Sequence, residues 1–197
     1  MSDPRIVGIV VWALMIVGWW LVRRPYRRRA RRMGAADDRK SPVERTLLGL
    51  TIVGLVVLPV VWIATGWPEA LDRAQPWWSV VLGTLAAALF VWLFRRSHKD
   101  LGRNWSVSLE IREEHALVTQ GVYERMRHPM YASFFLWGIA QALLVANWLA
   151  GLAGLASIAL LYAGRIRAEE RMMRDTFGTA YEEYAASTRA LLPIRRV

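Results

Sequence analysis

The stretch that decides the fold is ASFFLWGIAQALLVANWLAGLAGLASIALLYAG, residues 132–164. Its 33 residues carry no charged side chain, whereas about 20 apolar residues suffice for one membrane-spanning helix. The polar Asn147 near its middle would lie in hydrocarbon if the run formed one long tilted helix, and this disfavours that alternative. We therefore predict two spans, over 132–146 and 148–164, joined as a tight helical hairpin.

Three further apolar stretches precede this hairpin, each about as long as a spanning helix requires. They are Ile6–Val22, Thr46–Gly66 and Trp77–Phe94. Pro59 lies inside the second stretch and predicts a kink there. The sequence therefore predicts an all-α integral membrane protein with about five transmembrane helices, of which the last two form the hairpin.

We expect a single membrane domain over residues 1–197. Its N-terminal part, 1–94, would hold three spans, and its C-terminal half, 95–197, would hold the site. One Arg precedes the first apolar stretch and no small-residue cleavage site follows it. This pattern predicts a retained span rather than a signal peptide.

Composition and charge are those of a membrane protein. Hydrophobic residues make up 55% of the chain, and yet the formal net charge is +10. The charges are gathered in blocks between apolar stretches, so the basic excess points to anionic lipid headgroups. An arm that binds nucleic acid is the less favoured interpretation, because no RNA- or DNA-binding motif accompanies it. Cysteine is absent, which excludes disulfides and thiolate metal sites.

The basic residues also predict an orientation. Residues 23–45 hold ten Lys or Arg, and residues 95–130 and 165–197 hold seven each, whereas residues 67–76 hold only Arg73. Cytoplasmic loops carry the excess of Lys and Arg. We therefore expect the N-terminus outside, and the C-terminus and the site on the cytoplasmic side.

A polar segment, GVYERMRHPMY, occupies residues 121–131 just before the apolar run. Pro129 suits the first turn of the helix that follows, and the backbone N–H groups of that turn lack helical partners and can receive an anionic group. Thr119-Gln120-Gly121 predicts a turn ahead of the segment. Charged groups at the mouth of a membrane hairpin are costly unless they bind something.

Arg165, Glu169 and Glu170 follow the hairpin. Arg165 and Glu169 are four residues apart and share one face of a helix. The carboxylate can accept hydrogen bonds from a ribose or hold an ammonium group, and the guanidinium can grip an anion with two donors. An ordinary surface salt bridge is the alternative for this pair.

Several other chemistries lack support in the sequence. His115 and His128 are 13 residues apart, which matches no standard metal-ligand spacing, so we expect no metal. No phosphate-binding glycine loop, Walker motif or Ser/His/Asp arrangement is present. Hydride transfer and phosphoryl transfer therefore have no local motif to carry them.

The order of residues in the C-terminal half resembles the isoprenylcysteine carboxyl methyltransferase family, which belongs to a larger group that includes phospholipid N-methyltransferases. The resemblance is carried by LGRNWS, HALVTQGVYERMRHPMY, AEERMMRDTFGTAYEEY and Leu192-Pro193, between Leu101 and Pro193. It implies an integral membrane enzyme that binds S-adenosylmethionine in a cytoplasmic pocket rather than on a Rossmann sheet. The implied partners are the lipid bilayer and a lipophilic or small methyl acceptor, with no nucleic acid and no metal.

The resemblance also implies roles for particular residues. Arg165 would face the methyl acceptor, and Glu170 would support the cofactor site. One departure is Ser133, where the family often has glycine; a hydroxymethyl there bears on close approach to the cofactor and weakens the interpretation as a phospholipid N-methyltransferase. The residues implied to line the cofactor pocket are His115, Ala116, Leu117, Val118, Tyr123, His128, Pro129, Met130, Tyr131 and Glu169.

The mechanism depends on the acceptor. The sulfonium already activates the methyl group, so the protein must align a nucleophile for in-line attack. Arg165 would orient a carboxylate acceptor without a general base, whereas an amine or thiol would lose a proton to His128 or a Glu. The alternatives are a phospholipid-amine or thiol methyltransferase, a reductase that resembles NADPH-dependent sterol reductases, and a membrane scaffold without activity.

Overall fold

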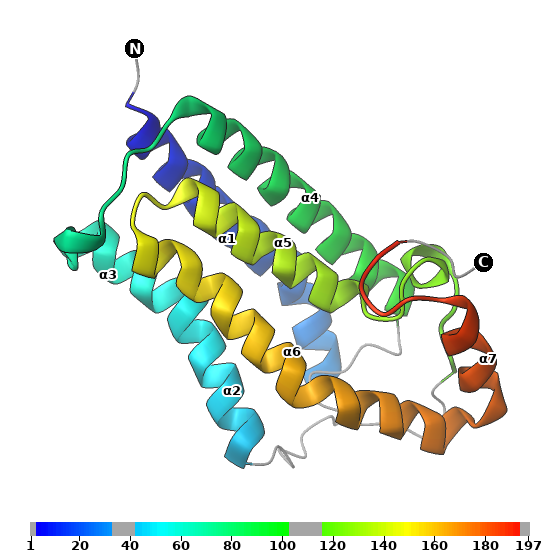
Figure 1. Ribbon diagram of the computed structural model, residues 1–197. Helices are drawn as coiled ribbons and strands as arrows, with labels where there is room; N and C mark the ends of the chain where they lie inside the picture. The colour runs from blue at the N-terminus through cyan, green and yellow to red at the C-terminus, as the bar shows by residue number, and fades with distance from the viewer. Residues whose placement is uncertain (1–2, 33–41, 103–115, 194–197) are drawn as a thin grey trace.

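The computed structural model describes residues 3–32, 42–102 and 116–193. Within these ranges the regular secondary structure is helical, and the only pairings of extended backbone are two isolated bridges. The longer helices form one bundle, with the shorter α7 folded back beside its end (Figure 1). The α-helices are α1 (Pro4–Arg32), α2 (Pro42–Ile52), α3 (Leu58–Thr65), α4 (Trp77–Leu101), α5 (Pro129–Leu144), α6 (Trp148–Phe177) and α7 (Thr179–Ser187).

Helix α1 is longer than its apolar stretch predicts. It continues past Val22 through the basic residues to Arg32, with Pro25 inside it. Its 29 residues extend about 43 Å at 1.5 Å per residue, against about 30 Å of bilayer hydrocarbon. The first part of the basic block is therefore a helical extension of the span rather than a loop. Arg24 lies over the ring of Trp20, 4.8 Å from its centroid, as expected of a basic residue beside an interfacial aromatic.

The second apolar stretch forms α2 and α3, joined by one π-helical segment, η1 (Val53–Val57). Pro59 lies two residues after this segment and has no N–H to donate to the carbonyl of Leu55, which accounts for a local departure from α-helical bonding. The carbonyl oxygen of Gly54 instead accepts a hydrogen bond of 2.8 Å from Gln141 Nε2 on α5. In place of the kink predicted at Pro59, the structure therefore has one π-helical turn shortly before the proline.

The apolar run 132–164 divides at Asn147 into α5 and α6. Asn147 is the N-cap of α6, and its side-chain oxygen accepts a hydrogen bond of 3.0 Å from the backbone N–H of Ala150. The two helices pack very closely, because a Cβ on Gly138 of α5 would lie 2.7 Å from the Cα of Leu155 on α6. Asn147 lies at the end of the bundle beside Asp72, not at mid-membrane.

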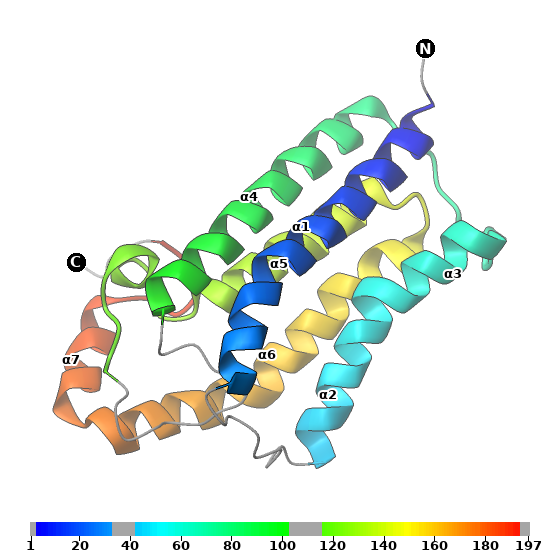
Figure 2. The ribbon, with the colours of Figure 1, turned by 180° about the vertical axis from the view of Figure 1, so that it is seen from behind.

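Helix α5 is the centre of the bundle. It lies between α4 and α6 (Figures 1 and 2). Helix α1 packs against α4 and also contacts α5. Phe90 and Phe94 of α4 pack with Phe134 and Trp137 of α5, with ring centroids 4.9 to 6.3 Å apart. This aromatic core fixes the position of α5, whose first residues carry the polar segment identified in the sequence.

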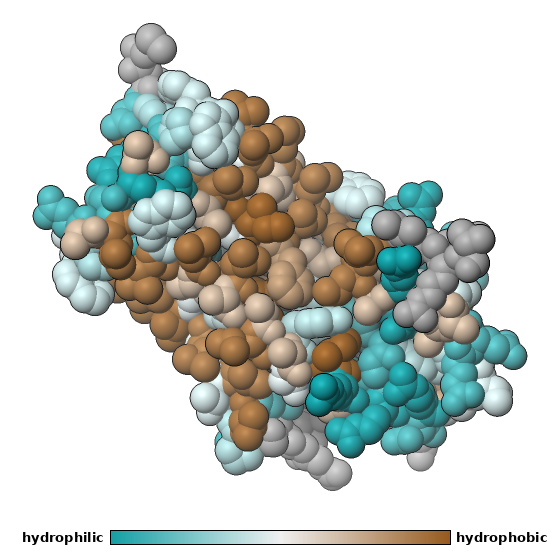
Figure 3. All heavy atoms as spheres, viewed as in Figure 1, coloured by the Kyte–Doolittle hydropathy of each residue, from teal (hydrophilic) through white to brown (hydrophobic). Residues whose placement is uncertain are grey.

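Four helical segments are long and apolar enough to cross a membrane: Pro4–Arg29, Pro42–Thr65, Trp77–Leu101 and Trp148–Phe177. Helix α5 is also apolar but has only 16 residues, about 24 Å at 1.5 Å per residue. Apolar side chains form a band across the molecule, with polar surface at both ends (Figure 3). The chain therefore has the fold of an integral membrane protein, with four long spans and a shorter fifth.

Candidate functional site

The start of α5 meets the last third of α6, and this contact brings the predicted residues together. The hydroxyl of Tyr131 donates a hydrogen bond of 2.6 Å to Glu169 Oε1. Nδ1 of His128 lies 3.8 Å from Glu169 Oε2. Tyr162 of α6 packs edge-on against the ring of Tyr131, with centroids 5.3 Å apart, and so restrains that ring.

The neighbouring acid, Glu170, holds the other side of His128. His128 Nε2 is 2.8 Å from Glu170 Oε1, and Arg127 Nε donates to the same oxygen over 3.0 Å. Arg174 reaches Glu170 Oε2 at 3.4 Å. Glu170 is only 8% exposed, and a buried carboxylate requires such partners. Glu170 therefore holds the imidazole of His128 in place.

The backbone of this segment is held by the C-terminal part of the chain. The N–H of Arg127 donates to the carbonyl of Arg189, and the N–H of His128 donates to that of Ala190, both over 2.9 Å. Met126 and Arg189 form a parallel bridge. Arg127 also donates through Nη1 to the carbonyls of Ala185 and Thr188. His128 is consequently fixed from α6 through its ring and from the C-terminal segment through its backbone.

Arg165 lies between two acids on different helices. Its Nη2 is 3.3 Å from Glu169 Oε1, one turn along α6, and its Nη1 is 3.3 Å from Glu44 Oε1 in the first turn of α2. The three side chains are only 13–14% exposed. The pair predicted from the four-residue spacing is therefore present, and it is part of a three-residue cluster that bridges α2 and α6.

The turn ahead of the polar segment is present as predicted. Gly121 adopts a φ of +66°, which glycine tolerates best. It opens the short 3-10 helix η4 (Gly121–Glu124). Asp100 Oδ2 accepts a hydrogen bond of 3.0 Å from the N–H of Val122. Tyr123 is buried against Leu93 of α4, and this burial raises the pKa of the phenol above its ordinary value.

The pocket residues implied by the resemblance are not all in one contact cluster. His128, Tyr131, Arg165, Glu169 and Glu170 contact one another as described above. Pro129 and Met130 form the first turn of α5, with Pro129 buried. Tyr123 and Val118 belong to a separate apolar cluster against α4. Ala116 and Leu117 lie in the irregular segment before η4, and His115 lies outside the described residues.

Ser133, the position that departs from the family pattern, is fully buried. Its hydroxyl donates a hydrogen bond of 2.6 Å to the carbonyl of Met130 in the preceding turn. The hydroxyl is therefore directed back onto its own helix, where it satisfies a backbone group.

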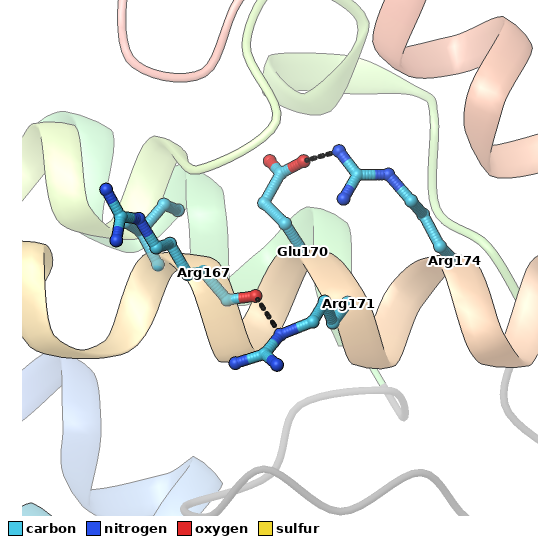
Figure 4. A pocket seen from close by; sticks show the side chains of 5 residues that line it. Arg167, Glu170, Arg171 and Arg174 are labelled. Carbon is cyan, nitrogen blue, oxygen red and sulfur yellow. Dashed lines mark hydrogen bonds and ion pairs between the residues drawn. The ribbon is translucent and has the colours of Figure 1, made fainter.

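An open pocket of about 540 Å³ lies beside Glu170 on α6. Arg174 is directed toward Glu170, and Arg171 donates from Nε to the carbonyl of Arg167 (Figure 4). Ile166 completes the lining. Glu170 thus joins this basic hollow to the His128 contact. No group of three or more His, Asp or Glu side chains among the described residues has the geometry to hold a metal ion.

Sequence reasoning missed two residues of the site. Arg127 was within the polar segment but was given no role, because nothing local in the sequence indicates that it shares Glu170 with His128. Glu44 gave no signal, because it is 121 positions from Arg165 and occupies an ordinary helix start. Acids in a first helical turn are common for electrostatic reasons alone.

Comparison with known proteins gives one family. Residues 80–175 match the model of the isoprenylcysteine carboxyl methyltransferase family. This range contains α5, most of α6 and every contact among His128, Tyr131, Arg165, Glu169 and Glu170.

Curated relatives agree with that match. Protein-S-isoprenylcysteine O-methyltransferase B of Arabidopsis thaliana is 34% identical over 113 residues, which are 56% of this chain and 57% of the relative. The corresponding A protein is 30% identical over 60% of this chain and 61% of its own length. The Homo sapiens protein-S-isoprenylcysteine O-methyltransferase is 30% identical over 64% of this chain and 44% of its own length. The chain thus spans less than two thirds of these relatives.

Proposed function

Because residues 80–175 match the model of the isoprenylcysteine carboxyl methyltransferase family, we propose that this chain is an S-adenosylmethionine-dependent methyltransferase that forms methyl esters on a lipophilic carboxylate at the membrane. The observation that carries the proposal is the contact of His128 and Tyr131 at the start of α5 with Glu169 and Glu170 on α6. A membrane bundle has no structural need for so many partly buried charged groups at this place.

The residues at this contact fit the cofactor's chemistry. Glu169 Oε1 is engaged by Tyr131, whereas no hydrogen bond to Oε2 is found among the described residues. That oxygen is available to accept from a ribose hydroxyl or an ammonium group. The first turn of α5 has no side-chain cap, and its N–H groups suit a carboxylate. Tyr131, Glu169 and the first turn of α5 would thus hold S-adenosylmethionine, which supplies an activated methyl group.

Arg165 would orient the acceptor. Its guanidinium lies one helical turn from Glu169, so a carboxylate bound to it lies next to the proposed cofactor position. A carboxylate is already a nucleophile and gives up no proton, and so alignment is the main task of the protein. His128, fixed by Glu170 and by the carbonyl of Ala190, would shape the wall of the cofactor site rather than act as a base.

We propose that the site is cytoplasmic. α1 and α6 both continue beyond a membrane thickness at the end that carries their Arg residues, and basic residues favour the cytoplasmic side. The N-terminus would then lie outside. We further propose that residues 1–197 form one membrane domain, with the catalytic half in 95–197.

The test uses the purified chain in lipid nanodiscs with radiolabelled S-adenosylmethionine. We expect saturable binding to the unmodified chain, and loss of binding in Glu169→Ala and Tyr131→Ala. NADPH serves as the competing ligand, because a sterol-reductase-like protein would bind it instead. Binding no higher than in empty nanodiscs, or equal binding by the two variants and the unmodified chain, would disprove the cofactor assignment.

The acceptor is tested separately with an N-acetylated S-isoprenylcysteine and radiolabelled cofactor. We expect a base-labile methyl ester to form on the carboxylate. An amine-headed phospholipid and a small alkyl thiol are the comparison acceptors. Transfer to either of these, and none to the carboxylate, would change the assigned reaction from O- to N- or S-methylation.

A further inference from the structure

The guanidinium proposed to hold the acceptor is already in contact with a carboxylate of the chain itself. Glu44 Oε1 lies 3.3 Å from Arg165 Nη1. Resting on the function proposed above, we propose that Glu44 occupies the acceptor's binding position on Arg165. A carboxylate acceptor must then displace Glu44, so that the start of α2 acts as a latch on the site.

The geometry of the cluster leaves Arg165 incompletely used. A guanidinium has five N–H donors, and the ion pairs with Glu44 and Glu169 are both 3.3 Å long. Arg165 Nε is buried and has no hydrogen-bond partner among the described residues. A planar carboxylate that binds through two parallel hydrogen bonds would satisfy such a group better than the two longer ion pairs do.

Charge repulsion explains why Glu44 must leave Arg165 when the acceptor carboxylate binds, rather than share the guanidinium with it. Arg165 already faces two carboxylates, those of Glu44 and Glu169. A third carboxylate from the acceptor would add a negative charge beside those of Glu44 and Glu169, in a region that is largely shielded from solvent. Like charges this close cannot all remain ionised without a large cost. Departure of Glu44 restores the original balance, since the acceptor takes its place with the same charge.

The packing below Glu44 shows what must move. A Cβ on Gly164 would lie 2.7 Å from Leu47 Cδ1, so α2 and α6 are in direct contact one turn below the ion pair. A Cβ on Gly49, by contrast, would have no neighbour within 4 Å, so that side of α2 is open. An acceptor with an apolar tail that enters between these helices would therefore displace the first turns of α2 together with Glu44.

A purely structural ion pair makes opposite predictions. If Glu44 only tied α2 to α6, its loss would weaken the fold and would leave acceptor affinity unchanged or reduced. If Glu44 competes with the acceptor, its loss raises the fraction of molecules that are ready to bind. The apparent dissociation constant falls in proportion to that fraction.

The kinetic test compares Glu44→Gln with the unmodified chain in nanodiscs, using an N-acetylated S-isoprenylcysteine as acceptor. We expect the KM for the acceptor to fall about three- to tenfold, with kcat and the KM for S-adenosylmethionine changed less than about twofold. Glu69→Gln is the matched control, because Glu69 is exposed in the short helix η2 (Glu69–Leu71) between α3 and α4. An unchanged or higher acceptor KM in Glu44→Gln would overturn the proposal.

A second measurement does not depend on activity. The chain has no cysteine, so Val43→Cys and Ala168→Cys, both at exposed positions, can carry a pair of spin labels across α2 and α6. We expect the distance between the labels to increase when the acceptor carboxylate is added, but not with its carboxamide. Glu44→Gln should increase the distance without any ligand.

The two measurements separate the two proposals. Absence of methyl transfer by the unmodified chain disproves the proposed function. Absence of a distance change in ligand-free Glu44→Gln disproves the latch, whether or not transfer occurs. Equal responses to the carboxylate and the carboxamide also disprove it.

Discussion

The two ends of the α5–α6 hairpin both bury polar side chains, but they satisfy them differently. At the turn end, Asp72 accepts hydrogen bonds from Arg5 over 2.6 Å, from Trp62 over 2.7 Å and from Asn147 over 2.9 Å. At the other end, Arg165 contacts Glu44 and Glu169 only at 3.3 Å and keeps a buried donor unused. The first cluster is complete, and the second has capacity left for a ligand.

The turn end also secures the backbone. Arg73 donates to the carbonyls of Ala142 and Val145 at the end of α5. Gln75 and Ser79 both donate to the carbonyl of Leu143. These carbonyls have no partner within their own helix, so side chains of the α3–α4 loop and of the first turn of α4 replace the missing turn. Gln75 Oε1 at this end is also buried without a hydrogen-bond partner among the described residues, so the two ends differ in that the unused group at the other end belongs to a charged side chain, Arg165.

The largest expected effect is at Arg165. We expect Arg165→Ala to lower kcat/KM for the acceptor by about 10²- to 10³-fold, the usual result of removing a group that positions and stabilises charge. Cofactor affinity should change little, because Arg165 contacts the acceptor side. Parallel measurement of radiolabelled cofactor binding and methyl transfer checks both statements. A joint loss of binding and transfer would contradict the division of roles between Arg165 and Glu169.

The next effect is at Glu169. Glu169→Gln keeps the size of the side chain but removes its charge, and a hydrogen bond to a charged group contributes about 1.5–3 kcal/mol. We therefore expect the Kd for S-adenosylmethionine to rise about 10- to 100-fold. Equilibrium dialysis of the variant in nanodiscs measures it. Tyr131→Phe should have a smaller effect, about fivefold, since it removes a neutral donor.

At the turn end the effect should fall on stability instead. Asp72→Ala leaves Arg5, Trp62 and Asn147 without their shared acceptor, and we expect the free energy of unfolding to fall by about 2 kcal/mol. Thermal unfolding in detergent measures this loss. Cofactor affinity of the folded fraction should be unchanged. A stable Asp72→Ala variant that loses cofactor affinity would remove the distinction between the two ends.

Acid sensitivity gives the smallest and most specific effect. Burial raises the pKa of Asp72, but hydrogen bonds from Asn147, Trp62 and Arg5 outweigh it, so the pKa lies below its ordinary value. The stabilisation is therefore present above the pKa of an unfolded Asp, about 3.9, and is lost as the pH falls toward the folded value. Asp72→Asn should lose less stability than the unmodified chain between about pH 5 and 3. Identical pH profiles would contradict the assignment.

The sequence predicted those parts of the fold that depend on local composition. The length of the run 132–164 and the position of Asn147 predicted the hairpin, and Pro59 predicted an irregularity. The helical continuation of α1 to Arg32 was missed, because hydropathy marks where a helix leaves the membrane and not where it ends. Arginine has a high helix propensity, so the basic block continues the helix.

The site was predictable to a similar degree. The four-residue spacing of Arg165 and Glu169 predicted their contact, since both lie on one helix. The contact of His128 with Glu170 was not predicted, although the resemblance implied a role at the cofactor site for each of them, because it joins two helices across 42 positions. Glu44 was not predictable, since its contact with Arg165 depends on how α2 packs against α6.

The bonds from Arg189 and Ala190 to residues 127–128 have a consequence for biosynthesis. The two carbonyls that hold Arg127 and His128 are made 62 positions after them, which takes roughly 3–12 s at about 5–20 residues per second. The hairpin therefore emerges and enters the bilayer before His128 can reach its final position. During that interval the nascent chain is inserted, but its site is incomplete. We therefore expect only a chain that has been synthesised beyond residue 190 to bind the cofactor.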